Sequence, residues 1–293
     1  MPTFSTPEPI TATLELVAGI ARIVAGDRGQ TVVTVQPSDD SHELDRRAAE
    51  QTQVEYAAGR LLVRTPKQRG LGLFGRAGSV DVTIELPAGS RLDGSATMVA
   101  FHCSGRLGDC RIKITAGDIQ LDDTGPLELS TGAGTIAVNR VVGPAGLSTG
   151  TGKIRLGDVD GSAVVKNANG DNWIGQISGD LRVRTANGDI DVDQAQGDVT
   201  AATANGSIRV GGLVRGTVSL KTAAGQIEIG VRTGTAARLD VHTSFGRVRN
   251  QLDAVDGPEP ADETVDVRAR TSYGDIVIRR TPSPQLAGAQ EQK

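Results

Sequence analysis

The sequence predicts an all-β chain whose main part is a β-solenoid, a parallel β-helix-like coil with about 18 residues per turn. Three observations predict this fold. Short runs of alternating apolar and polar residues follow one another, a glycine recurs between paired runs at a nearly constant step, and fixed positions around that glycine hold the same residue types. A steady period with matching columns is typical of repeat architectures, in which each unit forms one turn of a larger coil.

The repeating unit is clearest in GDLRVRTANGDIDV, residues 179–192. Leu181 and Val183 alternate with arginines in a first strand, and Ile190 and Val192 flank an aspartate in a second. This alternation indicates two half-buried strands joined at a glycine turn. Two such strands bury too few aliphatic side chains to fold alone, so the unit requires stacked neighbours.

The turn glycine recurs with a step of 17 to 19 residues that lengthens to 21 and then 28 near the end. It occupies positions Gly117, Gly134, Gly152, Gly170, Gly188, Gly206, Gly225, Gly246 and Gly274. From Gly134 onward, a threonine stands three residues before the glycine, replaced once by Asn167, which predicts a polar ladder at a corner. Two and four residues later stand isoleucine, valine or leucine in nearly every copy, which predicts the core.

An antiparallel meander of hairpins is the alternative fold. Asn169, Asn187 and Asn205 directly precede their glycines. Asparagine and glycine both tolerate positive φ, which favours a left-handed corner, but Asn-Gly is also a strong signal for a two-residue hairpin. A meander needs no fixed period and no threonine at one fixed place, so the parallel solenoid is the favoured prediction.

Outward charges support in-register stacking. The residue three places after the turn glycine alternates in sign from Asp191 through Arg209 and Glu228 to Arg249. If consecutive copies lie directly over one another, opposite charges face each other across the turns, whereas like charges there would be destabilising.

The chain divides into three predicted parts. Residues 10–90 contain strand-like runs of a different rhythm and are expected to form a β-rich N-terminal module that caps the first solenoid turn, with one loop or short helix at 38–55. Residues 91–280 form the solenoid, from which an acidic insert loops out before the last turn. Residues 281–293 are expected to be a disordered tail.

The composition argues against several classes of protein, namely nucleic-acid-binding, membrane-spanning and disulfide-rich proteins. The 293 residues carry a net charge of -4, which argues against nucleic-acid binding, and the aromatic content of 2% does not suit a bulky globular core. No run of 18 apolar residues and no signal-like N-terminus occur, so we expect no membrane span and a cytoplasmic location. Two cysteines do not make a disulfide framework.

Five apolar residues are candidate partner contacts. Leu71, Leu73 and Phe74 lie in a basic, glycine-rich loop at residues 66–79, which lacks the GK[ST] ending of a phosphate loop and therefore predicts no nucleotide cofactor. Phe245 and Tyr273 replace asparagine at the corner of the last two turns. These two either cap the end of the core or form a contact patch with the acidic insert.

No metal or other cofactor is predicted. The spacing of His102, Cys103 and Cys110 matches no common zinc site, and Cys110 aligns with the inward-facing Leu181, which indicates a buried thiol. Aspartates follow several of the glycines, but the nine-residue period of calcium-binding β-rolls is absent, so we expect them to cap exposed backbone amides at the turns.

The copies TAGDIQL, TGTGKIRL, TANGDIDV, TANGSIRV and TSYGDIVI, preceded by SVDVTIELPAGS, resemble the bacterial β-strand-repeat family labelled "putative adhesin", a domain of unknown function common in actinobacteria. The resemblance extends over about residues 10 to 280. It implies a β-solenoid-like fold and no known catalytic residues.

These observations favour a non-enzymatic scaffold or interaction protein that binds a protein partner. One alternative is a cytoskeleton-like β-helical scaffold that self-assembles through its ends. Another is a polysaccharide-binding or polysaccharide-active β-helix, for which Asp191, Asp193 and Glu228 on one face are the candidate carboxylates.

Overall fold

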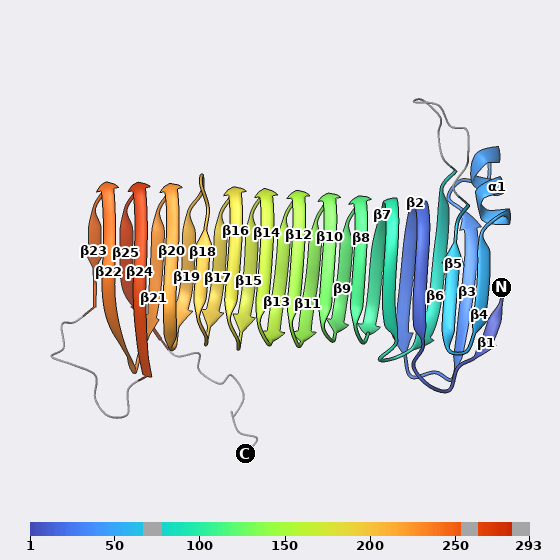
Figure 1. The fold of residues 1–293 in the computed structure, drawn as a ribbon, viewed down its shortest axis with the longest axis horizontal. Coiled ribbons are helices and arrows are strands. Elements are labelled where there is room, and N and C mark those ends of the chain that lie inside the picture. Colours follow the sequence, from blue (N-terminus) through green and yellow to red (C-terminus); the bar gives the residue numbers. More distant parts are fainter. Residues whose placement is uncertain (67–77, 253–262, 283–293) are drawn as a thin grey trace, which may run out of the picture.

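The computed structural model describes residues 1–66, 78–252 and 263–282. These residues form one 25-stranded β-sheet that is wound into a long solenoid, with strands arranged side by side from the N-terminal end to β22 and β23 (Figure 1). Each turn contributes one strand to each of two facing layers, which we call sheet 1 and sheet 2. The prediction of an all-β solenoid is therefore confirmed.

Sheet 1 is built from strands that pair in one continuous order. From the N-terminal end these are β4 (Gln53–Ala57), β5 (Arg60–Arg64), the first half of β2 (Thr11–Gly26), the first half of β7 (Arg91–Arg106), β8 (Cys110–Ala116), β10 (Leu127–Ala133), β12 (Ala145–Thr151), β14 (Ala163–Asn169), β16 (Leu181–Asn187), β18 (Val199–Ala202), β20 (Gly216–Ala224), β24 (Glu263–Tyr273) and β22 (Thr235–Phe245).

Sheet 2 faces it in the same order. Its strands are β1 (Thr3–Ser5), β3 (Gln30–Pro37), β6 (Val80–Pro87), the second halves of β2 and β7, β9 (Ile119–Thr124), β11 (Ile136–Val142), β13 (Ile154–Asp160), β15 (Asn172–Ile177), β17 (Ile190–Ala195), β19 (Ile208–Leu213), β21 (Ile227–Arg232), β25 (Ile276–Thr281) and β23 (Val248–Asn250).

Neighbouring turns pair in parallel and in register along the middle of the solenoid. Leu181 lies beside Val199, and Ile190 lies beside Ile208, so identical columns stack as the sequence predicts. The antiparallel meander is wrong, because each strand of the repeat pairs with the strand two elements later. The inward aliphatic columns are buried between the two sheets and form one continuous core.

The threonine ladder has a specific hydrogen-bonding role. The Oγ1 of Thr203 donates to the Gly188 carbonyl at 3.1 Å, and the Oγ1 of Thr222 donates to the Gly206 carbonyl at 2.9 Å. Each of these two threonines thus satisfies a carbonyl at the glycine corner of the turn beneath it. Buried carbonyls without a partner are costly, which explains one threonine per turn at this position.

Glycine is required at the corner for two separate reasons. Gly188 has φ of +137°, and a Cβ there would lie 2.2 Å from the carbonyl oxygen of Gly170 in the turn beneath.

The expectation that the preceding asparagines adopt positive φ is wrong, since Ala58 is the only non-glycine residue with positive φ in the described ranges. Instead Asn187 donates from Nδ2 to the Oδ1 of Asn169 at 2.8 Å, and Asn205 repeats this contact one turn later.

The predicted aspartate caps are confirmed. The Oδ1 of Asp118 accepts a hydrogen bond from the backbone N–H of Thr135 at 2.7 Å, and Asp189 accepts one from Ser207 at 2.7 Å. Each carboxylate therefore reaches the amide at the start of the neighbouring turn. The aspartates after the glycines cap amides at the corner.

Stacking departs from chain order at the C-terminal end. Strands β24 and β25 lie between β20 and β21 on one side and β22 and β23 on the other (Figure 1). The prediction that consecutive copies always lie directly over one another is wrong here. As a result Glu228 lies beside Val277, and the predicted facing of Glu228 and Arg249 does not occur.

The N-terminal end shows a similar intercalation. Strand β2 pairs in parallel with β5 and β6 along one edge and with β7 along the other, so residues before position 91 already form solenoid turns. Strands β1, β3 and β4 run antiparallel and close this end, together with α1 (Glu43–Glu50). The rings of Phe4 and Tyr56 lie 5.0 Å apart here. Among the described residues, no helix has the length and apolar character needed to cross a bilayer.

Candidate functional site

The stacked aromatic side chains at the C-terminal end form the most exposed aromatic feature in the described part of the chain. Phe245 at the end of β22 and Tyr273 at the end of β24 occupy the column that holds Asn187 and Asn205 in earlier turns. Their ring centroids lie 4.9 Å apart at an interplanar angle of 9°. Phe245 is 65% exposed and Tyr273 is 61% exposed.

The local fold explains this exposure. The column lies at the outer corner of the solenoid, directly before the turn glycine, so its side chains stand outside the core. The two rings therefore stack on each other outside the core, in the column where the asparagines hydrogen-bond to one another. Beyond the glycine, Arg249 forms an ion pair of 3.5 Å with Asp275. We call Phe245, Tyr273, Arg249 and Asp275 the aromatic corner.

The other three predicted contact residues, Leu71, Leu73 and Phe74, lie outside the described residues. The chain on either side of them reaches a cavity of about 700 Å³ between β2, β5, β7 and β8. Its lining is mixed, with Leu16, Ala96 and Ile114 beside the charged Arg64 and Lys113. Arg64 donates to Glu15 at 2.7 and 2.9 Å, and this hydrogen-bonded pairing raises the pKa of the guanidinium.

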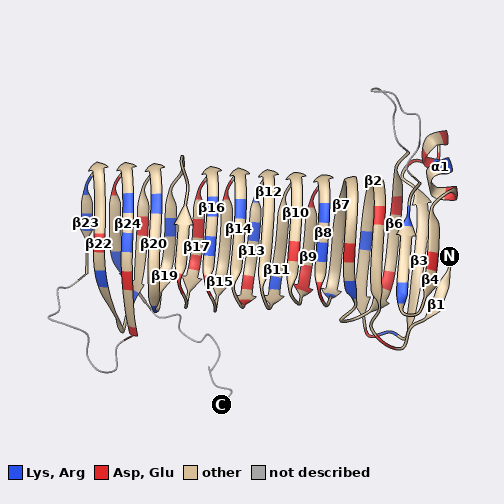
Figure 2. Ribbon diagram, in the orientation of Figure 1, with Lys and Arg blue, Asp and Glu red and all other residues tan. Residues whose placement is uncertain are grey.

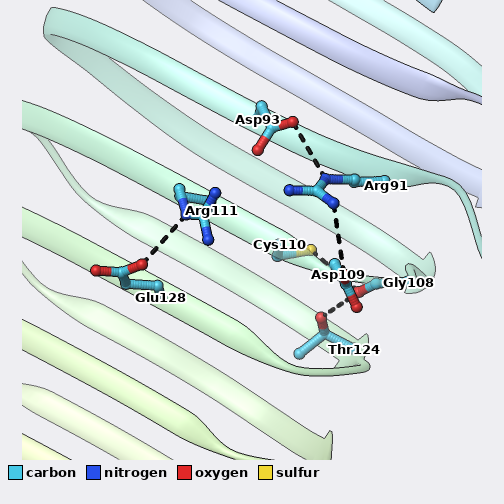
Figure 3. A network of polar contacts seen from close by, with 8 residues as sticks. All are labelled: Arg91, Asp93, Gly108, Asp109, Cys110, Arg111, Thr124 and Glu128. Carbon is cyan, nitrogen blue, oxygen red and sulfur yellow. Dashed lines mark hydrogen bonds and ion pairs between the residues drawn. The ribbon is translucent and has the colours of Figure 1, made fainter.

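A shallow groove on sheet 1 carries a network of charged side chains (Figure 3). It encloses about 450 Å³ across β7, β8, β10, β12 and β14. Arg91 lies 3.2 Å from Asp93 and 3.7 Å from Asp109, and Arg111 lies 3.2 Å from Glu128. Because these charges pair with one another, the groove has little net charge to attract an ionic ligand.

The interpretation of Cys110 as a buried thiol is confirmed. Cys110 is 2% exposed, and its Sγ lies 3.6 Å from the Gly108 carbonyl, which also accepts a hydrogen bond from Thr124 (Figure 3). Burial raises the pKa of the Cys110 thiol to about 11 and the pKa of the buried Cys103 thiol well above its usual value. His102 instead lies 3.1 Å from Gln120. In the described ranges no three His, Cys, Asp or Glu side chains gather as a metal site would require.

The candidate carboxylates for polysaccharide chemistry are held in ion pairs on sheet 2. Asp191 accepts a hydrogen bond from Arg209 at 2.9 Å, and Asp193 lies 3.8 Å from the same guanidinium. The hydrogen bond with Asp191 raises the pKa of Arg209. Glu228 pairs with Arg279 from the intercalated strand β25. Charged residues of both signs occur along the whole length of the solenoid (Figure 2).

One turn carries buried polar groups that the sequence pattern did not explain. Asn167 and Asn172 replace the usual threonine and isoleucine, and both donate to the Gly170 carbonyl, at 3.0 and 3.3 Å. Thr185 is the residue that would otherwise bond this carbonyl, and its buried hydroxyl has no hydrogen-bond partner. The Asn167 Oδ1 atom is also buried and unpartnered.

The chain matches one known protein family over most of its length. A family model described as Toastrack DUF4097 matches residues 21–279. The chain belongs to the Toastrack DUF4097 family. This match confirms the resemblance to a β-strand-repeat domain family of unknown function. Solved structures similar to this chain include proteins called putative adhesins. No curated protein sequence matches this Toastrack chain.

Three solved structures illustrate the similarity. A putative lipid binding protein from Parabacteroides distasonis has 12% identity and a TM-score of 0.44, with 95% of each chain covered. The putative adhesin BF0245 from Bacteroides fragilis has 12% identity and a TM-score of 0.33, again with 95% of each chain covered. A putative cell adhesion protein from Clostridium sporogenes has 10% identity and a TM-score of 0.25, with 96% of this chain and 98% of that chain covered.

Proposed function

We propose that this Toastrack chain is a non-enzymatic interaction protein that binds a protein partner through the aromatic corner. The observation that carries the proposal is the stacked, exposed pair Phe245 and Tyr273. Exposed large aromatic side chains are unusual on a chain with so few of them, and aromatic residues and arginine are enriched at the energetic centres of protein interfaces.

The geometry suits an anchor for a protein surface. Because the two rings stack on each other, their side chains are already restricted before a partner binds. Binding therefore costs less side-chain conformational entropy. The Arg249–Asp275 ion pair, across the corner glycines from the rings, supplies hydrogen-bonding groups at the rim. The rest of the solenoid acts as a rigid support whose ladder of backbone hydrogen bonds fixes the position of this corner.

A matched pair of double variants tests the proposal. F245S/Y273S removes the rings, whereas N187S/N205S changes the same column two and three turns earlier in the chain. Proteins captured by immobilised full-length chain from the native host are quantified for wild type and both variants. We expect capture of the partner to fall at least tenfold for F245S/Y273S and to be unchanged for N187S/N205S, because truncated interface anchors commonly cost about 2 kcal/mol or more. Equal capture by both variants, each with unchanged thermal unfolding, would refute the proposal.

A further inference from the structure

The C-terminal end of the solenoid leaves its core open in the described part of the chain. Strand β22 pairs with β24 along one edge, and no described strand pairs along the other. The inward-facing Leu239 and Val241 of β22 are only half-buried, whereas their column neighbours Val267 and Ala269 in β24 are fully buried. Val248 in β23 is 43% exposed. This end therefore presents both apolar side chains and a strand edge.

The hydrogen-bonding pattern shows which backbone groups point out of the open edge. In earlier turns the inward residue at the start of the sheet 1 strand donates its N–H to the following turn, as Leu181 does to the Asp198 carbonyl at 2.8 Å. Leu239 holds this position of the column in β22, and no described turn follows it. The free donors and acceptors of the edge therefore belong to Leu239 and to the inward residues two places either side of it, Ala237 and Val241.

The outward side chains of this edge are alternately charged. Arg238 is 89% exposed and lies 3.9 Å from Asp266, and Asp240 lies 3.5 Å from Arg270. Charged side chains on an edge strand normally oppose pairing with another strand. An alternating pattern opposes it only in some registers, because in others each charge faces its opposite.

We propose that two copies of this chain associate through antiparallel pairing of β22 with β22, with Leu239 on the two-fold axis. Only registers that pair inward with inward residues use the free backbone groups. A register centred on Arg238 or on Asp240 places like charges opposite each other. The register centred on Leu239 places Arg238 of each copy opposite Asp240 of the other and pairs Ala237 with Val241.

This register also closes the core. A two-fold axis perpendicular to sheet 1 keeps the inward side chains of both copies on the same face, so the half-exposed Leu239 and Val241 of each copy pack against those of the other. The alternation of charge then continues across the seam, because Asp266 and Arg238 of one copy are followed by Asp240 of the other. The N-terminal end is covered by β1, β3 and β4, so pairing at this seam produces a closed dimer.

The dimer is independent of the function proposed above. Phe245 lies beyond the paired segment at the outer corner, so an antiparallel seam places the two aromatic corners at its opposite ends. F245S/Y273S is therefore expected to leave dimerisation unchanged. Loss of partner capture in F245S/Y273S would therefore say nothing about dimerisation, and loss of dimerisation in a β22 variant would say nothing about partner capture.

Two opposite charge variants of the full-length chain provide the test. In R238D both charged positions are acidic, and in D240R both are basic. Each variant alone places like charges across the seam twice, but an equimolar mixture can form a heterodimer in which every pair is complementary. The ion pairs lost within each chain are exposed and contribute little to stability. R184D, in the middle of sheet 1, is the control.

Sedimentation velocity over a concentration series is the measurement. We expect wild type and R184D to form a species of twice the 30.4 kDa chain mass. R238D and D240R alone should each raise the dissociation constant at least tenfold, and their mixture should restore it to within about threefold of wild type. A wild-type monomer up to about 100 µM, single variants that dimerise normally, a mixture that fails to associate, or open-ended assemblies would each overturn the proposal.

Discussion

Replacement of Gly188 by alanine tests the physical basis of the stacked corner. Gly188 combines φ of +137° with a position where a Cβ would lie 2.2 Å from the Gly170 carbonyl oxygen. A side chain in this backbone region costs about 1 to 3 kcal/mol. The contact also requires these two stacked turns to separate by about 1 Å, which weakens the ladder hydrogen bond between them from the Gly170 N–H to the Asn187 carbonyl, and such a bond contributes about 0.5 to 1.5 kcal/mol.

The two effects together predict that G188A lowers the free energy of unfolding by about 2 to 4 kcal/mol. For a chain of this size that corresponds to a decrease in Tm of roughly 4 to 16 °C in a thermal melt followed by circular dichroism. The matched control is G146A in β12, where φ is not positive and the nearest atom to an added Cβ is the Leu127 carbonyl oxygen at 3.7 Å. We expect G146A to be neutral or stabilising by up to about 1 kcal/mol. If G188A unfolds at the same temperature as G146A, the corner does not depend on glycine and the reasoning is wrong.

Three further predictions concern buried and titratable groups. N167T/N172I restores the usual residue types in one turn and removes unpartnered buried polar atoms, so we expect it to raise the free energy of unfolding by about 1 to 2 kcal/mol in a denaturant titration. Cys103 and Cys110 should resist alkylation by iodoacetamide in the folded chain and react after unfolding, as measured by mass spectrometry. Because burial raises the pKa of Cys110 to about 11, the stability that the protonated Cys110 thiol contributes should be lost as the pH rises from about 9 towards 11. Hydrogen bonds from Ser41 and then His42 lower the pKa of Asp39 to about 2. The stability that these contacts of the Asp39 carboxylate contribute should therefore be present above about pH 4 and be lost as the pH falls from about 4 to 2. The carboxyl chemical shift of Asp39 in NMR measures this titration.

The middle of the solenoid could be predicted from sequence because its information is local. The position of Ile190 two residues after Gly188 is repeated in nearly every turn, and in-register stacking is the arrangement that buries all of these columns at once. The aspartate caps follow from the same logic, since a carboxylate directly after a turn glycine meets an amide at the corner of the neighbouring turn, as Asp118 and Asp189 do. The candidate contact at Phe245 and Tyr273 is a prediction from the sequence, which rests on their departure from the asparagine of their column.

The order of the turns at the C-terminal end could not be predicted from the period, because the two last copies share its glycine and threonine positions and both carry an aliphatic residue two places after the glycine, Val248 and Ile276. A signal was nevertheless present in the sequence. Asn250 stands at the core position that Ile278 and Ile229 occupy in the neighbouring turns. A turn with a polar residue in its core column is costly inside the stack and tolerable at its end. The more apolar copy, β24 and β25, is therefore buried on both sides, and β22 and β23 occupy the end.

This order changes how the end of the molecule can open. In a solenoid stacked in chain order, the last residues form the last turn and can fray without disturbing the rest. Here residues 276–281 lie inside the stack, where Ile276 and Ile278 are fully buried, and the outermost turn is an internal segment. Strand β25 pairs with β21 along one edge and with β23 along the other. It can leave the stack only after β23 has separated from it, or by breaking the hydrogen bonds along both edges at the same time. Local opening at this end must therefore begin with β22 and β23. Because the proposed dimer would cover the outer edge of β22, dimerisation should protect the amides of β24 from hydrogen exchange as well as those at the seam.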